Sequence, residues 1–450
     1  MKTTKPSLPF FSSVAAAIEL EQRRCVPRPV PVPVPPGVPI GTFWNPYKTA
    51  PRPVAEGDLV NITKSASAAR ASRRKNYTLQ RAASRLLPSE RVSKCQFFTR
   101  PNKHISIYHS TEHGKAFYKN LMACGSVWNC PVCAAKIAER RAAETLAAMW
   151  AHRATGGEVL LLGLTAPHYF DTNIEGQLTR QNQALRQMWG TRAVRRLLES
   201  WGCVGSIRAL EVTHGQNGWH PHFHILLFVR SGLDVESMKR SLYVCWLKVC
   251  LAVGLPAPGF AHGVDIRDGN YASDYVTKGL THEKKEGWGL HNEITKGHIK
   301  TGRDSSTPFD LLRAYDEGNK QAGALFVEYS KAFKGRRQLV WSPGLKALFS
   351  IGDRSDLEIA ESAEEPAVFG CNVSREDWWV VMAWRARAQL LEAYEEGGAV
   401  EVGRLLSILR ADELPDDVGA TARGFGMTED RFLAFWRRRA KASSEAGHDG

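Results

Sequence analysis

The segment His220–His224, which reads HPHFH, constrains the fold of this chain more than any other feature of its sequence. The apolar run that follows, ILLFV, is typical of a buried strand. Successive side chains of a strand point to opposite faces of the sheet, so His220, His222 and His224 must share one face. Three imidazoles on one face are unfavourable as passive core. They are therefore expected to bind a metal ion or to act as acid–base groups, and a histidine cluster without metal is the alternative.

A second strand, predicted over residues 206–213, precedes the histidines, and the sequence GQNG at 215–218 indicates a hairpin turn. If Gln216 and Asn217 form the turn, Glu211 lies opposite His222. If the turn is centred one residue later, Glu211 lies opposite His224. Either register places Glu211 on the histidine face, and two histidines with one carboxylate suit a divalent cation.

The rest of the chain alternates between predicted strands and helices. Further strands are expected at 158–165 and 263–267, and helices at 134–150, 177–200, 235–252, 270–278, 376–409 and 428–442. With one clear hairpin in the middle, this order predicts an α+β fold in which helices flank an antiparallel sheet.

Three cysteines lie within ten residues in CGSVWNCPVC, which runs from Cys124 to Cys133. The turn from Cys130 to Cys133 can offer two zinc ligands, and Cys124 is close enough to be a third. Nine cysteines are too few and too clustered for a secreted disulfide scaffold, so a reducing compartment is expected. Zinc bound in a closed tetrahedron would be structural, and three buried cysteines without metal are the alternative. The candidates for the fourth ligand are Cys95 as the first choice and His109 or His113 as the second.

The chain has 450 residues and a formal net charge of +14, which points to a polyanionic partner, either nucleic acid or an anionic membrane surface. Its ordinary globular composition excludes a chain that is disordered throughout. No apolar run approaches the roughly 18 residues that a membrane-spanning helix needs. The apolar stretch near the start is interrupted by Pro9 and by Ser12-Ser13, unlike that of a secretion signal, so a cytoplasmic location is expected.

The charge is distributed unevenly along the chain. Residues 351–450 carry 20 acidic and 12 basic side chains, so the first 350 residues carry a net charge of +22. The proline-rich stretch 26–53 favours polyproline II or disorder. Four regions are predicted from these shifts: a flexible, proline-rich basic arm at 1–75, a zinc-knuckle region at 76–140, the main α+β domain at 141–350, and an acidic helical region at 351–450.

The sequence YASDYVTK at 271–278 places Tyr271, Tyr275 and Lys278 on one face of a predicted helix. A tyrosine hydroxyl can attack phosphorus, and a lysine one turn further on can stabilise the charged phosphate. Tyrosines at this spacing more often pack or lie at the surface. The nearby histidine strand favours the catalytic interpretation.

Taken together, these motifs resemble those of a known family. HPHFHILLF resembles the metal-binding motif of the HUH endonucleases, and YASDYVTK resembles the YxxxYxxK motif of rolling-circle replication initiators with two tyrosines. LLLGLT at 160–165 resembles the first motif of those initiators, and CGSVWNCPVC is similar to cysteine knuckles in plasmid replication proteins. The order, with the tyrosines after the histidines, matches the initiators, whereas conjugative relaxases have the reverse order. The resemblance covers roughly residues 90–345.

The resemblance implies an HUH-type antiparallel sheet over 141–350 that nicks and binds DNA, preceded by a zinc knuckle and followed by a helical tail. His222 and His224 would hold Mg²⁺ or Mn²⁺, Glu211 would be the third ligand, and His220 matches an extra histidine of this type. Tyr275, assisted by Lys278, would attack the DNA and form a 5′-phosphotyrosine link, and Tyr271 could make the second attack. The implied partners are single-stranded origin DNA, a host helicase and a host polymerase, without a membrane.

Three other interpretations remain open at this point. An HUH transposase or relaxase would share the chemistry, a histidine-triad nucleotide hydrolase would share the His-x-His-x-His pattern, and a non-catalytic zinc-dependent regulator would bind DNA without nicking it. A basic cluster near the end of the main domain could contact DNA phosphates or form a solvated face. It consists of Lys331, Lys334, Arg336 and Arg337.

Overall fold

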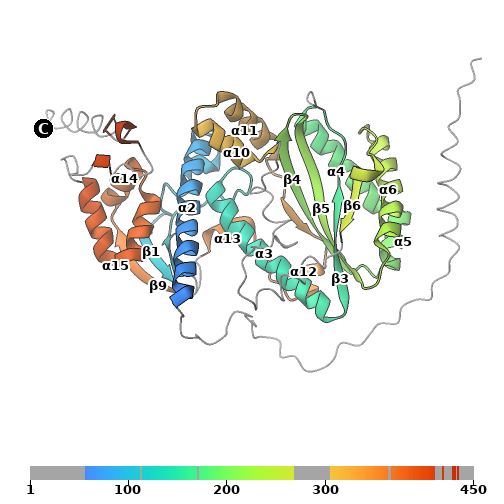
Figure 1. Cartoon of the computed structure of the whole chain (residues 1–450), viewed down its shortest axis with the longest axis horizontal. Helices are drawn as coiled ribbons and strands as arrows, with labels where there is room; N and C mark the ends of the chain where they lie inside the picture. Colours follow the sequence, from blue (N-terminus) through green and yellow to red (C-terminus); the bar gives the residue numbers. More distant parts are fainter. Residues whose placement is uncertain are drawn as a thin grey trace, which may run out of the picture.

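The computed structural model describes residues 56–111, 114–169, 172–267, 305–362 and 366–410, together with 418–419, 428–431 and 433–434. The proline-rich segment 26–53 lies outside the described residues, and so do Tyr271, Tyr275 and Lys278. Within these ranges the chain forms two antiparallel sheets with flanking helices, which confirms the predicted α+β class. The sheets lie toward opposite ends of the molecule, with helices between them (Figure 1).

The larger sheet has the strand order β6-β3-β5-β4-β7, and β8 also pairs with β4. All of these pairings are antiparallel. The predicted hairpin is formed by β4 and β5, and Gly218 at its turn has φ +80°, a conformation that favours glycine. The strands are β3 (Gly157–Leu164), β4 (Gly205–Gly215), β5 (Gly218–Arg230), β6 (Val264–Arg267), β7 (Ser305–Ser306) and β8 (Leu339–Trp341).

One face of the larger sheet is covered by two helices, α4 (Ile174–Gly190) and α6 (Val235–Ala252). Leu178 of α4 and Trp246 of α6 belong to the same buried cluster as Phe223 of β5. This apolar layer holds β5 in place from the side opposite its histidines, because alternate residues of a strand face opposite ways.

Among the described residues, helices cover the other face at one end. There, α3 (Pro131–Ala154) and α12 (Leu345–Leu348) contribute Met149 and Leu345 to a buried cluster that includes Phe228 of β5. His220, His222 and His224 lie on the same face toward the hairpin end, where they are half-buried. The histidine strand therefore has an apolar, covered end and a polar, more open end.

Two long predicted helices are interrupted in the structure. The expected helix 177–200 is divided into α4 and α5 (Arg192–Ser200), because the extended residue Thr191 caps α5 by accepting a hydrogen bond from Val194 N. The expected helix 376–409 is divided into α14 (Arg375–Ala383) and α15 (Arg387–Arg410), with Arg385 at φ +60° between them. α15 itself is kinked at Gly397–Gly398.

The smaller sheet has the order β2-β1-β9 and packs against α14 and α15. Its strands are β1 (Ile105–Ser110), β2 (Lys115–Lys119) and β9 (Ala367–Val373). β9 comes from the region predicted as an acidic helical tail, whereas β1 and β2 come from the predicted zinc-knuckle region. Residues 366–410 are thus neither entirely helical nor a separate unit, because β9, which begins at Ala367, completes a sheet that begins at Ile105.

The long helix α2 (Glu56–Leu86) crosses the boundary that the sequence predicts at residue 75. Its side chains also contact the predicted tail, since Arg73 lies 2.6 Å from Glu395 and Arg74 pairs with Glu392 of α15. Acidic residues of the C-terminal region therefore neutralise a basic helix that was expected to be part of a flexible arm. The remaining helices are η1 (Arg91–Lys94), α7 (Phe260–Gly263), α10 (Pro308–Asp316), α11 (Lys320–Phe333) and α13 (Asp356–Glu361).

Candidate functional site

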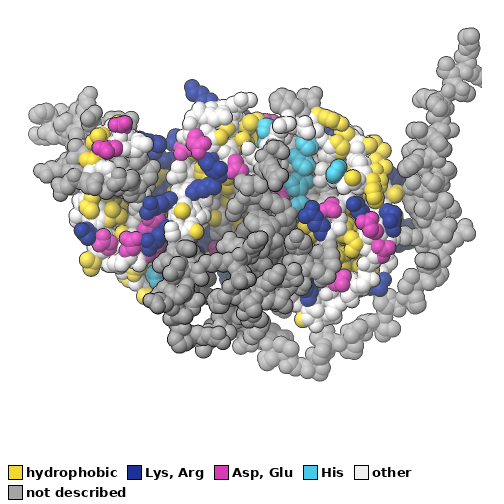
Figure 2. Space-filling view, in the orientation of Figure 1, with side chains coloured by type: hydrophobic (Ala, Val, Ile, Leu, Met, Phe, Trp, Pro, Cys, Tyr) yellow, Lys and Arg dark blue, Asp and Glu magenta, His cyan; other side chains and the backbone are white. Residues whose placement is uncertain are grey.

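The structure selects the first of the two predicted hairpin registers. Glu211 of β4 pairs with His222 of β5, and Ala209 pairs with His224. Glu211 lies on the histidine face, as both registers required. In Figure 2, histidine side chains form a group on the surface over β4 and β5.

Glu211 lies between two imidazoles. Its Oε2 is 3.3 Å from His222 Nε2, and its Oε1 is 3.3 Å from His224 Nδ1. The three groups can each place one ligand atom within 4.8 Å of the others. The Glu211 side chain is 4% exposed, whereas each histidine side chain is 15% exposed. The arrangement thus has a buried carboxylate at its base and imidazoles toward solvent.

The charge state of Glu211 fits a cation site. Burial alone would raise the pKa of this carboxyl, but the adjacent His222 and His224 outweigh burial and lower the pKa below its ordinary value. In the described part of the chain, Glu211 Oε1 forms no hydrogen bond. An ionised, buried carboxylate oxygen beside two imidazole nitrogens can ligate a divalent cation.

His220 is placed differently from the other two histidines. Its ring stacks on His168, with ring centroids 4.4 Å apart and an interplanar angle of 14°. Burial lowers the pKa of His220 to about 3, and the neighbouring His222 and His168 contribute in the same direction. His220 is thus a neutral ring beside the group formed by Glu211, His222 and His224. His168 was missed by sequence reasoning, and the only signal for it was its position shortly after the LLLGLT strand.

Gly163 of β3 connects the histidine face to a second acidic residue. It pairs with His224 on one side and with Asp265 of β6 on the other. The Asp265 side chain is 45% exposed and lies 2.7 Å from Arg267 Nε. Sequence reasoning predicted the strand but did not single out Asp265. Because β6 ends at Arg267, the tyrosine motif follows directly after the strand that bears this acid.

The four candidate zinc ligands come together in a separate, closed cluster. The Sγ atoms of Cys95 and Cys133 are 3.5 Å apart, those of Cys124 and Cys133 are 3.6 Å apart, and those of Cys130 and Cys95 are 3.7 Å apart. Tetrahedral zinc with Zn–S bonds of about 2.3 Å requires sulfur separations of about 3.8 Å. All four cysteines are buried, so the cluster fits a structural zinc site.

The pKa values of the clustered thiols shift in opposite directions. Burial raises the pKa of Cys130 above its ordinary value, whereas hydrogen bonds from the neighbouring thiols lower the pKa of Cys133. Backbone amides also point at the sulfurs, with Cys124 N 3.4 Å from Cys95 Sγ and Ser126 N 3.5 Å from Cys124 Sγ. These contacts are typical of thiolates that ligate a metal.

The structure also tests the choice of the fourth cysteine-cluster member. Cys95, which follows η1, takes that position, as the first choice predicted. His109, one of the two alternatives, lies in β1 opposite Ala116 and beside Tyr394, outside the group of four cysteines. His113 lies outside the described residues.

The four predicted DNA-contacting residues differ in exposure. Lys331, Lys334 and Arg337 are exposed, while Arg336 is half-buried and its Nε donates to Ala332 O over 2.7 Å. Gln338 O accepts a hydrogen bond from Leu210 N, and Leu210 is the residue before Glu211 in β4. Arg337 directly precedes Gln338. Arg337 is therefore the predicted DNA-contacting residue that lies next to Gln338, the residue whose carbonyl bonds to the strand of Glu211. In the described ranges, no helix combines the length and apolar character that crossing a bilayer requires.

Comparison with known proteins gives an independent indication. A family model described as "Replication protein" matches residues 117–239, which include the cysteine knuckle from Cys124 and the histidine strand through His224. A Streptomyces lividans protein described as "Protein rep" is 28% identical over 358 residues, which cover 61% of this chain and 75% of that protein. A Streptomyces cyanogenus protein described as "Neomycin resistance protein" is 30% identical over 148 residues, 27% of this chain and 34% of that protein. No solved structure matches the chain.

The family match covers Glu211, His222, His224 and three of the four clustered cysteines, while Cys95 precedes it, and the similarity to the Streptomyces lividans protein extends over most of that protein. The comparisons thereby support the predicted resemblance to plasmid replication initiators: residues 117–239 match the replication-protein family, and a longer stretch of the chain is similar to the Streptomyces lividans protein.

Proposed function

We propose that this protein starts rolling-circle replication of a plasmid by nicking one strand of the origin and later rejoining it. The observation that carries the proposal is the group formed by Glu211, His222 and His224 on the open half of a sheet face. The matching replication-protein family supports a role at a plasmid origin.

The donor set suits a hard or borderline divalent cation. Glu211, His222 and His224 would hold Mg²⁺ or Mn²⁺, which as a Lewis acid would polarise the scissile phosphate. Glu211 is buried beneath the two imidazoles, and each of its carboxylate oxygens lies 3.3 Å from one of them. The solvent side of His222 and His224 would then face the DNA. The ring of His220, stacked on His168, would keep the neighbouring strand position rigid.

The covalent step is assigned to Tyr275 from the sequence motif. The Tyr275 hydroxyl oxygen forms a bond to phosphorus as the bond from phosphorus to the 3′ oxygen breaks. The tyrosine loses its proton, the departing 3′ oxygen gains one, and the DNA remains joined to the protein through its 5′ phosphate. Lys278 would stabilise the negative charge on the phosphate. Because the new bond is also a phosphodiester, rejoining needs no ATP.

The free 3′ hydroxyl is the group that a host polymerase extends, with a host helicase opening the duplex ahead of it. After one round, Tyr271 could attack the regenerated origin so that the circle closes. The net positive charge of the first 350 residues favours holding the DNA strand through its phosphates.

The test is a cleavage assay with Tyr275→Phe. A labelled single-stranded origin oligonucleotide is incubated with Mn²⁺, and the covalent adduct is measured on a denaturing gel. We expect the adduct to fall below detection in Tyr275→Phe, because phenylalanine has no nucleophilic oxygen, and to persist in Tyr271→Phe.

Tyr243→Phe is the matched control. Its hydroxyl donates to Pro258 O over 3.1 Å, away from the histidine group, so the adduct should be unchanged. Undiminished adduct in Tyr275→Phe would contradict the assignment of the nucleophile. No nicking by the wild-type protein, with binding retained, would favour a non-catalytic zinc-dependent regulator instead.

A further inference from the structure

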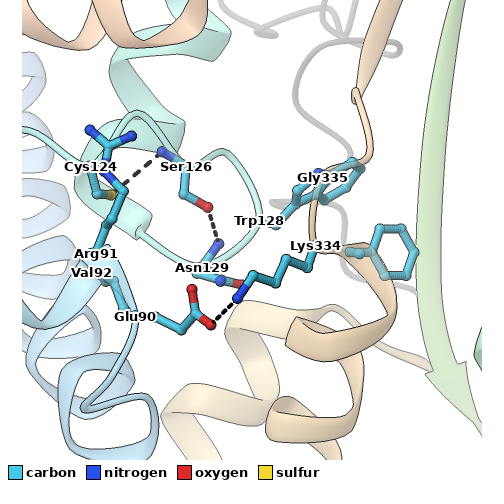
Figure 3. A pocket seen from close by; sticks show the side chains of 10 residues that line it. Glu90, Arg91, Val92, Cys124, Ser126, Trp128, Asn129, Lys334 and Gly335 are labelled. Carbon is cyan, nitrogen blue, oxygen red and sulfur yellow. Dashed lines mark hydrogen bonds and ion pairs between the residues drawn. The ribbon is translucent and has the colours of Figure 1, made fainter.

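A cavity of about 120 Å³ lies beside the cysteine cluster. It is enclosed by η1, by the knuckle segment that follows Cys124, and by the end of α11 (Figure 3). One buried water needs only roughly 10–15 Å³, so the cavity can hold a considerably larger group. The metal and tyrosine chemistry described above does not use it.

One wall of the cavity is aromatic and firmly held. The rings of Trp128 and Phe333 have centroids 4.7 Å apart, and both side chains are buried. Trp128 Nε1 donates to Arg336 O over 2.7 Å, and Tyr329 Oη donates to Trp128 O over 3.2 Å. Phe333 is fully buried and supports Trp128, which is 9% exposed, so the accessible part of this wall belongs to a fixed indole on which a flat, apolar ring could pack.

The cavity also contains a polar group that lacks a partner. Asn129 Oδ1 is buried, and in the described part of the chain it forms no hydrogen bond. The backbone fixes its position, since Asn129 N donates to Ser126 Oγ over 3.0 Å (Figure 3). A buried amide oxygen without a donor is unfavourable, and a ligand that supplies an N–H group would satisfy it.

The rim of the cavity is cationic. Arg91 is exposed, and Lys334 is 70% exposed while its Nζ lies 2.7 Å from Glu90 Oε1. Such a rim suits a phosphate, but a phosphate inside the cavity would meet an aromatic wall and the acceptor oxygen of Asn129. A nucleotide with its base inside and its phosphate at the rim agrees with all three features.

The cavity wall continues directly into the histidine sheet. From Lys334 and Gly335, which line the cavity, the chain runs to Gln338, whose carbonyl bonds to Leu210 beside Glu211. A DNA strand that crosses the histidine face could therefore reach the cavity along this segment.

We propose that the cavity binds one unpaired base of the origin strand, a base with an exocyclic amino group that donates to Asn129 Oδ1. The inference rests on the proposed function in that the ligand is single-stranded DNA. It assigns a base-reading role to the cysteine-knuckle region, separate from the cleavage site.

Asn129→Leu is the first test, because leucine has nearly the same size and Asn129 Oδ1 has no hydrogen bond within the described residues that would be lost. Binding of labelled single-stranded oligonucleotides that tile the plasmid origin is measured by anisotropy without added Mn²⁺, so that no strand is cut. We expect Asn129→Leu to weaken the tightest complex roughly tenfold, as loss of one base contact does. Abasic substitution at one adenine, cytosine or guanine should weaken wild-type binding by a similar factor and Asn129→Leu binding hardly at all.

Two lysines of the same segment provide a matched pair that does not depend on how Asn129→Leu folds. Lys334→Ala, at the rim, should weaken binding, whereas Lys331→Ala, which is exposed on the same helix but does not line the cavity, should weaken it less. The inference is overturned if wild-type protein binds none of the oligonucleotides, or if Asn129→Leu binds all of them within twofold of the wild-type affinity. It is also overturned if every abasic substitution weakens binding of Asn129→Leu by the same factor as binding of the wild-type protein. Failure of the proposed function would be distinguishable, because it would abolish Mn²⁺-dependent nicking and leave these binding results unchanged.

Discussion

The two candidate metal sites of this protein differ in how they meet solvent. The four cysteines are at most 5% exposed, and their sulfurs surround a closed centre. Glu211 is equally buried, but His222 and His224 lie half-buried on a sheet face that the described helices cover at its other end. A closed tetrahedron leaves no position for a substrate, whereas an open three-ligand group does. Exposure thus distinguishes the cluster that fits structural zinc from the group proposed to act on DNA.

The two sites also differ in the parts of the chain that form them. The cysteines come from the residue after η1, from a loop, and from the start of α3, so the cluster connects segments that no sheet joins. The histidines and Glu211 come from two paired strands whose hydrogen bonds already fix their spacing. A metal in the first site would hold loops together, whereas a metal in the second would add little to the fold.

The largest effect is expected from Cys130→Ser, which removes one ligand from the closed cluster. The free energy of unfolding should fall by at least about 4 kcal/mol, because the other three buried thiols lose their shared cation. Thermal unfolding followed by circular dichroism should show a drop in Tm of roughly 8–16 °C. Cys203→Ser is the control, since its Sγ lies outside the cluster, and it should cost about 1 kcal/mol or less. If Cys130→Ser and Cys203→Ser unfold at the same temperature, the cysteine cluster does not stabilise the fold through a shared metal ion.

Glu211→Gln should separate activity from stability. Loss of one ligand is expected to lower the nicking rate at least about 100-fold, while Tm stays constant or rises because a buried carboxylate has been removed. Initial rates on a labelled origin oligonucleotide and a parallel thermal melt measure both quantities. His220→Ala should have a smaller effect on rate than His222→Ala, because His220 lies outside the ligand group. If Glu211→Gln nicks DNA at the wild-type rate, the histidine site is not the catalytic one.

The smallest expected effect is the stabilisation that Mn²⁺ gives to the open site. At about ten times the dissociation constant, bound Mn²⁺ should add about 1.4 kcal/mol, or roughly 3–6 °C in Tm. The shift should be absent in Glu211→Gln and should be reversed by EDTA without unfolding the protein. If brief EDTA treatment unfolds the wild-type protein before nicking is lost, the cysteine site is the more open of the two.

Much of the histidine site followed from local pattern. Alternation in HPHFH was sufficient to place three histidines on one face, and Glu211 shared that face under either turn. The turn itself did not follow, because the four residues GQNG allow two registers. The structure has Gly215 paired with Gly218, with the left-handed conformation at Gly218, and so pairs Glu211 with His222.

Other features depended on contacts between distant parts of the chain. The breaks at Thr191 and Arg385 interrupt helices whose apolar patterns are continuous in sequence. His168 gave no pattern, since its importance comes from stacking on a ring 52 residues further along the chain. The charge of the C-terminal region suggested a separate unit, whereas Glu392 and Glu395 pair with arginines of α2.

The sequence by itself determined which side chains of this protein share a strand face or a cysteine turn, because periodicity fixes the direction of neighbouring side chains. It also pointed to replication initiators, since the motifs carry the resemblance that the comparisons support. Only the tertiary structure decided the strand register, the position of Cys95 in the cluster, the cavity at Asn129 and the joining of both chain halves in the small sheet. Those features depend on contacts between residues far apart in sequence, which local propensity does not encode.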